Sequence, residues 1–298
     1  MNGEKTKIIY MNNLQTSFNS HNDLAMLFSE LESFWGEKII LDFRNVSFIS
    51  ANQFAVLGCI LSHYQRLHKG AIINIQNVRP KVSSVMSVNG FGRHFSYPDR
   101  PDIHNTAIPY KIFKVSQIDE FERYITISIF NRNDIPKMTN EVKHRMIDNI
   151  LEIFNNVKEH TSSPALYTCG QYFPSKSMLY FTIADSGETI SQNVSSFLRE
   201  NNININSSNL EWAMQSGNST KKDAPGGLGL YLLSSFITLN EGELYIVSGN
   251  ETFEQTTKGI RYKYLDDSFN GTIVTMAFNL NDKSSYYWDD KDTANFIF

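Results

Sequence analysis

Three glycines stand directly before a strongly apolar segment in APGGLGLYLLSSFI, residues 224–237. Gly226, Gly227 and Gly229 predict a flexible loop that opens a helix. The first turn of a helix carries backbone N–H groups without helical partners, together with the positive end of the helix dipole, so such a loop can bind phosphate. Glycines before a helix can also serve only as hinge or packing residues, and the loop alone does not decide between these interpretations.

A carboxylate, an amide and an imidazole lie one helical turn apart in EIFNNVKEH, residues 152–160. Glu152, Asn156 and His160 share one face of a helix, next to its apolar stripe. Polar groups at such a border line a cleft more readily than they face open water. A solvated helix edge fits the same spacing, and His160 fits the negative end of the helix dipole.

A second carboxylate ends the apolar strand in MLYFTIADSG, residues 178–187. Asp185 can point into a pocket there, while Gly187 lets a flat ligand approach the backbone. Asp-Ser-Gly is also a common turn, so this segment too has a purely structural interpretation.

Hydrophobic spacing predicts the elements that carry these residues. A long amphipathic helix after Pro136 is indicated by seven apolar residues at helical spacing: Met138, Val142, Met146, Ile150, Ile153, Phe154 and Val157. YITISIF at 124–130 alternates like a strand, and GTIVTMAF at 271–278 predicts another. The stretch 251–271 is expected to be an extended hairpin loop. The acidic, aromatic tail 283–298 is expected to fold back over an apolar surface or to bind a partner.

The first hundred residues alternate strands and helices. Apolar runs at 38–43 and 70–75 predict strands, and helical spacing predicts helices over 23–35 and 51–69. This order favours a small α/β domain over residues 1–100. The proline-rich stretch 97–110 predicts a linker or long loop before a second domain over 101–282.

Composition limits the function classes. The chain has 298 residues, 41% of them hydrophobic and 19% charged, which suffices for one large or two medium folded domains. A net charge of -4 without a dense basic run argues against a nucleic-acid binder. No apolar run approaches the ~18 residues of a membrane span and no signal-like N-terminus occurs, so we expect a cytoplasmic protein with no membrane segment. Cys59 and Cys169 lack metal-ligand spacing and are expected to be buried free thiols.

Four pieces of the sequence follow one another in a characteristic order: the helix with Glu152 and Asn156, the strand ending at Asp185, the glycine loop, and the strand opened by Gly271 and Thr272. In this order and spacing they resemble the GHKL ATPase superfamily, which includes gyrase B, Hsp90, MutL, histidine kinases and anti-sigma-factor serine kinases. The resemblance spans about 108 to 282. It implies an α/β (α+β) Bergerat sandwich, in which helices cover one face of a mixed sheet.

The GHKL resemblance implies ATP and Mg²⁺ as cofactors and a role for each matching residue. Glu152 would be the general base, and Asn156 would bind the Mg²⁺ that bridges the ATP phosphates. Asp185 would accept the adenine amino hydrogen, with Gly187 under the base and Thr272 beside it. The nucleotide-binding loop would comprise Gly226, Gly227, Leu228, Gly229 and Leu230.

An ATP lid is implied over about 191–225. Lys221, on this lid, would contact the γ-phosphate or remain a solvated loop lysine. Two residues depart from the family pattern: Thr189 stands where the second glycine of Asp-x-Gly-x-Gly is expected, and Pro225 replaces the first glycine of the later loop. Both changes would weaken nucleotide affinity or stiffen the lid.

The stretch KIILDFRNVSFISANQFAVLG, residues 38–58, resembles the STAS family of small signalling domains. In that family a strand ends in a turn that carries a phosphorylated serine and opens a helix. The serine position falls at Asn52, whose amide has no hydroxyl to phosphorylate. The resemblance therefore implies a docking module rather than a phospho-switch.

Together the resemblances imply a Mg-ATP-binding signalling protein with slow ATPase or serine-kinase-like activity, which switches protein-partner binding through its ATP lid. The partner would dock on the STAS-like domain or the lid, and an ATP-dependent homodimer stays open. The alternative is a non-catalytic ATP sensor or scaffold in a stress or phage-defence system, although binding alone needs no base at Glu152. A histidine kinase is disfavoured, because no His-bearing helical hairpin precedes the ATPase region.

Overall fold

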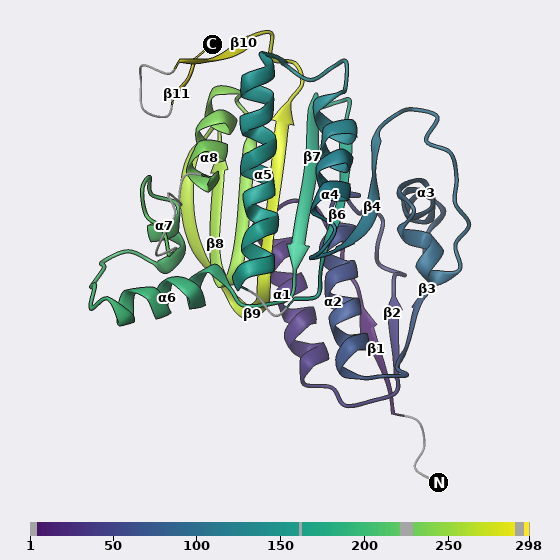
Figure 1. The fold of residues 1–298 in the computed structure, drawn as a ribbon. Coiled ribbons are helices and arrows are strands. Elements are labelled where there is room, and N and C mark those ends of the chain that lie inside the picture. The colour runs from purple at the N-terminus through teal and green to yellow at the C-terminus, as the bar shows by residue number, and fades with distance from the viewer. Residues whose placement is uncertain (1–4, 161–162, 221–228, 290–294, 298) are drawn as a thin grey trace.

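The computed structural model describes residues 5–160, 163–220, 229–289 and 295–297. Lys221, Gly226, Gly227 and Leu228 lie outside these residues. The described residues form one five-stranded sheet and two three-stranded sheets, and the N-terminal elements lie behind and below the five-stranded sheet (Figure 1). The mixed α/β composition expected from the sequence is confirmed.

The N-terminal region is a three-stranded parallel sheet with connecting helices. The strands are β1 (Thr6–Tyr10), β2 (Lys38–Asp42) and β3 (Ile72–Gln76), in that spatial order. Parallel neighbours need crossover connections, which α1 (Phe18–Glu32) and α2 (Gln53–Leu67) supply. The helix α3 (Pro80–Asn89) and the short η1 (Phe91–Phe95) follow. The predicted alternation of strands and helices is therefore confirmed, with β1 as an additional strand.

The larger sheet has five strands in the order β4-β6-β7-β9-β8. They are β4 (Ala107–Lys114), β6 (Ala165–Phe173), β7 (Met178–Asp185), β9 (Gly259–Asn279) and β8 (Glu243–Thr256). Every described neighbouring pair is antiparallel, so the expected mixed sheet is wrong for this sheet. The β4 strand also begins inside the stretch 97–110 that was expected to be a linker or loop.

Helices cover both faces of the larger sheet. On one face α4 (Ile118–Ile125), α5 (Asn140–His160) and α8 (Gly229–Leu239) bury a shared hydrophobic cluster (Figure 1). The predicted stripe of α5 is confirmed, since Val142, Met146 and Ile150 are fully buried. On the other face α1 and α2 lie against β6, β7 and β9. The expectation of helices on only one face is therefore wrong.

The helix α2 explains why the second face is covered. Every residue from 53 to 61 is buried, so the first part of this helix is buried all round rather than on one stripe. Such a helix needs partners on both sides. Its partners are the three-stranded sheet and the rear of the larger sheet, which share one hydrophobic cluster.

The stretch 124–130 is helical, so the predicted strand is wrong there. It spans the end of α4 and η2 (Thr126–Phe130), a single π-helical turn. Phe121, Ile125 and Ile129 lie four residues apart and are all fully buried. An apolar run this short fits the periods of both a strand and a helix, and packing on the larger sheet selects the helix.

The stretch 251–271 is not a loop, because β8 and β9 pair along most of it. Their register runs from Ser248↔Thr272 through irregularities near Gly249 to Thr256↔Gly259, where the hairpin turns. Gly259 has a φ of 110°, which glycine adopts without strain. Polar residues on the outer end of this hairpin conceal its strand pattern in the sequence.

The tail folds back onto the protein where it is described. The strand β10 (Ser285–Asp289) pairs with β5 (Lys137–Met138) and with β11 (Asn295–Ile297). Tyr286 is buried against the cluster under α5 and α8. Of the two expectations for the tail, folding back is confirmed for these residues.

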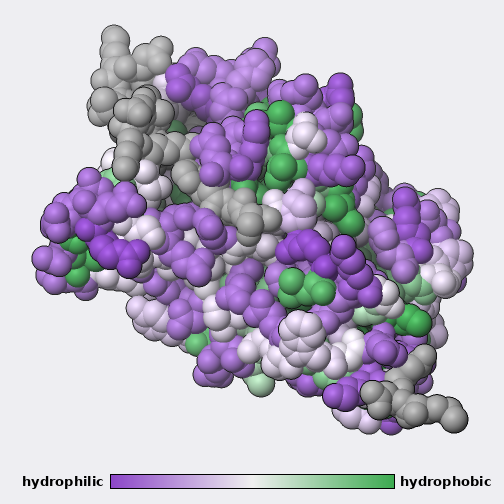
Figure 2. Space-filling model, turned by 60° about the horizontal axis from the view of Figure 1, so that its bottom comes forward, coloured by the Kyte–Doolittle hydropathy of each residue, from purple (hydrophilic) through white to green (hydrophobic). Residues whose placement is uncertain are grey.

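Two further expectations concern the thiols and membrane segments. Cys59 and Cys169 are buried free cysteines, as expected. Among the described residues, no helix combines the length and the apolar character needed to cross a membrane. The face in Figure 2 is mainly hydrophilic, with small separate hydrophobic patches.

Candidate functional site

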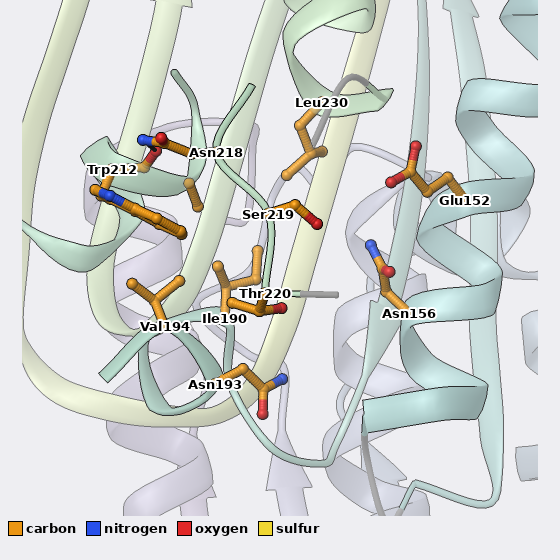
Figure 3. A pocket seen from close by; sticks show the side chains of 11 residues that line it. Glu152, Asn156, Ile190, Asn193, Val194, Trp212, Asn218, Ser219, Thr220 and Leu230 are labelled. Carbon is orange, nitrogen blue, oxygen red and sulfur yellow. Dashed lines mark hydrogen bonds between the residues drawn. The ribbon is translucent and has the colours of Figure 1, made fainter. Parts of the chain in front are cut away.

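Glu152 and Asn156 project from α5 into a cavity of about 100 Å³ (Figure 3). The opposite wall comes from Leu230 at the start of α8 and from the chain between β7 and α8. That chain contains α6 (Ile190–Glu200) and α7 (Asn209–Ala213). The other lining residues are Ile190, Asn193, Val194, Trp212, Ala213, Asn218, Ser219 and Thr220. The pair on α5 thus lines a cleft, which was one of the two interpretations that the sequence left open.

A second, smaller space of about 50 Å³ adjoins the first. Asp185 and Thr272 line it, and four residues line both spaces: Asn156, Ile190, Asn193 and Leu230. Glu152, Asp185 and Thr272 therefore face one connected region, although 33 positions separate Glu152 from Asp185 in the chain. Pairing of β7 with β9 brings Asp185 and Thr272 together, since the two residues are opposite each other.

Asp185 is an unusual carboxylate because it is 2% exposed and has no cationic partner among the described residues. Burial raises its pKa to about 8, although backbone hydrogen bonds from Thr272 and Gly187 act in the opposite direction. Its Oδ1 atom has no hydrogen-bond partner. A buried acceptor left unpaired costs about 1–3 kcal/mol. This oxygen is therefore available to a hydrogen-bond donor of a ligand.

Two hydroxyl groups connect the strands at this region to α6. The hydroxyls of Thr272 and Ser248 lie 3.0 Å apart, and Ser248 Oγ accepts a 2.7 Å hydrogen bond from the backbone of Ile190. Ser248 thereby ties β8 to the first residue of α6. Ser248 has no signal in the sequence, because only the β8–β9 pairing brings it next to Thr272.

Thr189 has a clear structural role in place of the expected glycine. It is the N-cap of α6 and forms a capping box with Gln192, at 3.0 Å and 2.8 Å. The spacing Thr-x-x-Gln is a sequence signal for such a helix start. This signal could have predicted α6 inside the stretch that was assigned to a lid.

Gly229 lies tightly against Glu152. A Cβ atom at position 229 would clash with the Glu152 carboxylate, and it would lie 2.8 Å from Cδ and 3.3 Å from Cβ of that side chain. Glu152 therefore sits at the N-terminal end of α8, where the helix dipole favours a negative charge. The expected glycine loop is described only at this last glycine.

The remaining predicted residues divide into two groups. Gly187 is half-buried next to Asp185 and Leu230 lines both spaces. Lys221, Gly226, Gly227 and Leu228 fall outside the described residues, as does the side chain of His160. Within the stretches of the chain that the structure describes, no group of three or more His, Cys, Asp or Glu side chains could hold a metal ion.

The N-terminal region touches the strand that ends at Asp185. Asn52 Nδ2 donates hydrogen bonds to the hydroxyls of Thr182 and Thr16, at 2.9 Å and 3.0 Å. Arg66 donates a 3.4 Å hydrogen bond to Ser186 Oγ, one residue after Asp185. The helix α2 therefore contacts both the strand and the turn that carry the buried carboxylate.

Comparisons with known proteins give no family for this chain: it matches no protein-family model and no curated protein. The case for function therefore depends on the geometry of the site.

Proposed function

We propose that the chain is a cytoplasmic Mg-ATP-binding regulatory protein of the GHKL type, with slow ATPase or serine-kinase-like activity. The observation that supports this most is the unpaired Oδ1 of Asp185, which is buried beside a space that adjoins the cavity of Glu152 and Asn156. The amino group of adenine would supply the missing donor. Thr272 would bind beside it, and Gly187 would leave room under the base.

The residues of α5 would act on the phosphate end of the nucleotide. Asn156 would bind Mg²⁺ through its amide oxygen, with phosphate oxygens and water completing the site, as that ion prefers. The bound ion would neutralise phosphate charge. Glu152, one turn away, would accept a proton from the attacking water or hydroxyl and orient it.

The site is too small for a nucleotide unless the wall between β7 and α8 moves. The two spaces, of about 100 Å³ and 50 Å³, are small beside the ~300–1,000 Å³ of typical ligand sites. Nucleotide binding would therefore displace α6, α7 and the chain up to Thr220. A partner that contacts this wall would then distinguish the nucleotide-bound protein from the free one.

The N-terminal region would hold the larger sheet in place rather than act as a phosphorylation switch. The residue at the STAS serine position, Asn52, is fully buried and hydrogen-bonded to Thr182 on β7. A kinase or docking partner would not reach it in this arrangement. Through Asn52 and Arg66, α2 would bias the position of Asp185 and its turn.

A non-catalytic ATP sensor or scaffold is the second candidate, and the position of Glu152 favours it. The carboxylate is held against Gly229 at the start of α8, which is also where a helix N-terminus would bind phosphate. If the phosphates occupy this helix start and keep the attacking water away from Glu152, the site would bind ATP without turning it over.

Calorimetry with Mg-ATP and an assay with γ-labelled ATP test the proposal together. We expect wild-type protein to bind Mg-ATP and Asp185→Asn to lose at least tenfold in affinity, since the variant presents an amide donor to the adenine amino group. Asp148→Asn, an exposed carboxylate on the same α5 helix as Glu152, is the matched control and should bind as wild type does. Equal affinity of wild type and Asp185→Asn would refute the assignment of the pocket.

The labelled-ATP assay separates the two candidate functions. Release of free phosphate that is lost in Glu152→Ala, with binding kept, would support an ATPase. Transfer of label to a protein would support a kinase, and binding with neither reaction would support the sensor.

A further inference from the structure

A second cavity lies away from the Asp185 site, between α3, the segment 100–107 and residue Gln171 of β6. Its volume is about 590 Å³, which lies within the usual range for a small-molecule site. It has no lining residue in common with either space of the Asp185 site. Nothing in the proposed ATP chemistry uses it.

One buried amide lines this cavity with a donor to spare. Asn89 is 1% exposed, and its Oδ1 accepts a 2.9 Å hydrogen bond from the backbone of Phe91. That bond fixes the orientation of the amide. Its Nδ2 has no hydrogen-bond partner among the described residues, so a buried donor is available to an acceptor in the cavity.

The charges of the lining favour an anion. Lys81 and Arg100 both line the cavity, and neither forms an ion pair within the described ranges. The one carboxylate of the lining, Asp102, already accepts backbone hydrogen bonds from His104 and Ala107, at 3.2 Å and 2.6 Å. It therefore shapes the segment 100–107, and the two cations outnumber it in the lining.

The rest of the lining is suited to an apolar body. Val85, Val88 and Ile103 contribute side chains to it, and Ile103 is 80% exposed. An exposed isoleucine at the mouth of a cavity gains from covering a ligand, since burial of apolar area is favourable by roughly 25 cal/mol per Å².

We propose that this cavity binds a small organic anion, in which a carboxylate or phosphate is attached to an apolar group. Lys81 and Arg100 bind the anionic group, Asn89 Nδ2 donates a hydrogen bond to one of its acceptors, and the aliphatic side chains of α3 and Ile103 cover the apolar portion. The site is independent of the proposed ATP pocket.

Calorimetry with phenyl phosphate, benzoate and inorganic phosphate tests this proposal on the full chain. We expect phenyl phosphate or benzoate to bind, and whichever binds identifies the preferred anionic group. Inorganic phosphate should bind at least tenfold more weakly than phenyl phosphate if the aliphatic lining contributes. Absence of binding by both organic probes would overturn the proposal, and so would equal binding of phenyl phosphate and inorganic phosphate.

Variants place the binding in this cavity. Lys81→Gln with Arg100→Gln should weaken binding at least tenfold, because the variant lacks both cations that bind the anionic group. Both residues are exposed, so the fold should not depend on them. The matched control is Lys258→Gln with Arg261→Gln, an exposed pair on the outer β8–β9 hairpin, which should bind as wild type does. Asn89→Asp keeps the acceptor for Phe91 and places an oxygen where Nδ2 was, so it should also abolish binding.

Two outcomes would assign the binding elsewhere and overturn the proposal. One is an equal loss of affinity in the control pair, which would indicate general charge attraction. The other is a loss of probe binding in Asp185→Asn, which would assign the anion to the proposed ATP pocket. Failure of Mg-ATP binding leaves this test unaffected, because the two sites share no residue.

Discussion

The side-chain amide of Asn52, in the turn that opens α2, donates a 2.9 Å hydrogen bond to the hydroxyl of Thr182 on β7. The Thr182 hydroxyl also lies 2.7 Å from that of Thr275 on β9. Three residues beyond Thr182, the same β7 strand ends at Asp185. A fully buried polar contact therefore joins the N-terminal region to the central strand β7 of the larger sheet and to its neighbour β9.

Replacement of Asn52 should destabilise the N-terminal region and the larger sheet together. Asn52→Ala removes the donor to Thr182 and Thr16 and leaves the buried Thr182 hydroxyl with fewer partners, which costs about 1–3 kcal/mol. Urea unfolding followed by circular dichroism should show one transition at a lower midpoint. Asn250→Ala, at an exposed position, is the control and should stay within about 0.5 kcal/mol of wild type. A wild-type midpoint for Asn52→Ala would contradict the proposed role of the contact.

Asp185 should make the stability of the free protein fall as pH rises. Burial raises its pKa to about 8, whereas an ordinary aspartate has a pKa of ~3.9. Between these values the folded protein holds a proton that the unfolded chain has released, so the free energy of unfolding decreases with pH and levels off above about pH 8. Because one pH unit corresponds to about 1.4 kcal/mol, the loss is on the order of 5 kcal/mol.

The measurement for Asp185 is the difference in unfolding free energy between wild type and Asp185→Asn at several pH values. The variant should lack this component, so it should become relatively more stable as pH rises from 5 to 8. Asp148→Asn, an exposed carboxylate of α5, should give a flat difference over the same range. A flat difference for Asp185→Asn as well would mean that the carboxylate is solvated.

Features that are set by neighbouring residues in the chain could be predicted from the sequence. The long helix α5 carries its own signal, since six of the seven predicted stripe residues lie on it and are buried, whereas Met138 belongs to β5. The position of Glu152 and Asn156 at the edge of that stripe fits a cleft or a solvated edge, and the chain packed opposite decides for the cleft. The site assignment of Asp185 likewise follows from an apolar strand that ends in a carboxylate and a glycine.

The errors arise where distant segments of the chain decide the structure. At 124–130 the apolar run fits two periods, and only packing of Phe121 and Ile125 on the larger sheet selects the helix. Ser248 reaches the site only through the pairing of β8 with β9. The apolar character of α2 indicates locally that it is buried on more than one side. It does not indicate which surface α2 covers, because that surface, on β6 and β7, is about a hundred residues further along the chain.

His21 should give a pH dependence of the opposite sign to that of Asp185. It is 3% exposed on α1, with its ring 6.1 Å from that of Tyr245 on the larger sheet. Burial lowers its pKa to about 4, from an ordinary value of ~6.5. Between these values the unfolded chain binds a proton that the folded protein excludes, so stability is lost as pH falls from about 6.5 to 4, by about 3 kcal/mol.

Comparison of wild type with His21→Gln tests this contribution by urea unfolding at pH 7, 5.5 and 4. The variant cannot titrate, so its deficit relative to wild type should shrink as pH falls. His144→Gln, an exposed histidine of α5, is the matched control. If the deficit of His21→Gln is the same at all three values, then His21 is not buried in its neutral form.

Gly229→Ala should separate nucleotide binding from turnover, if the protein turns over ATP as proposed. The added methyl group would displace the Glu152 carboxylate, because a Cβ atom at this position lies 2.8 Å from its Cδ. Asp185 and Thr272 line the other space and are not touched. Since a displacement of about 1 Å can cost 100-fold in rate, we expect phosphate release at saturating Mg-ATP to fall roughly 100-fold, and we expect a smaller loss of Mg-ATP affinity because the proposed adenine contacts remain. Glu152→Gln gives the reference for a correctly placed side chain without a base. If Gly229→Ala turns over faster than Glu152→Gln by tenfold or more, Glu152 does not need its position beside α8 to act.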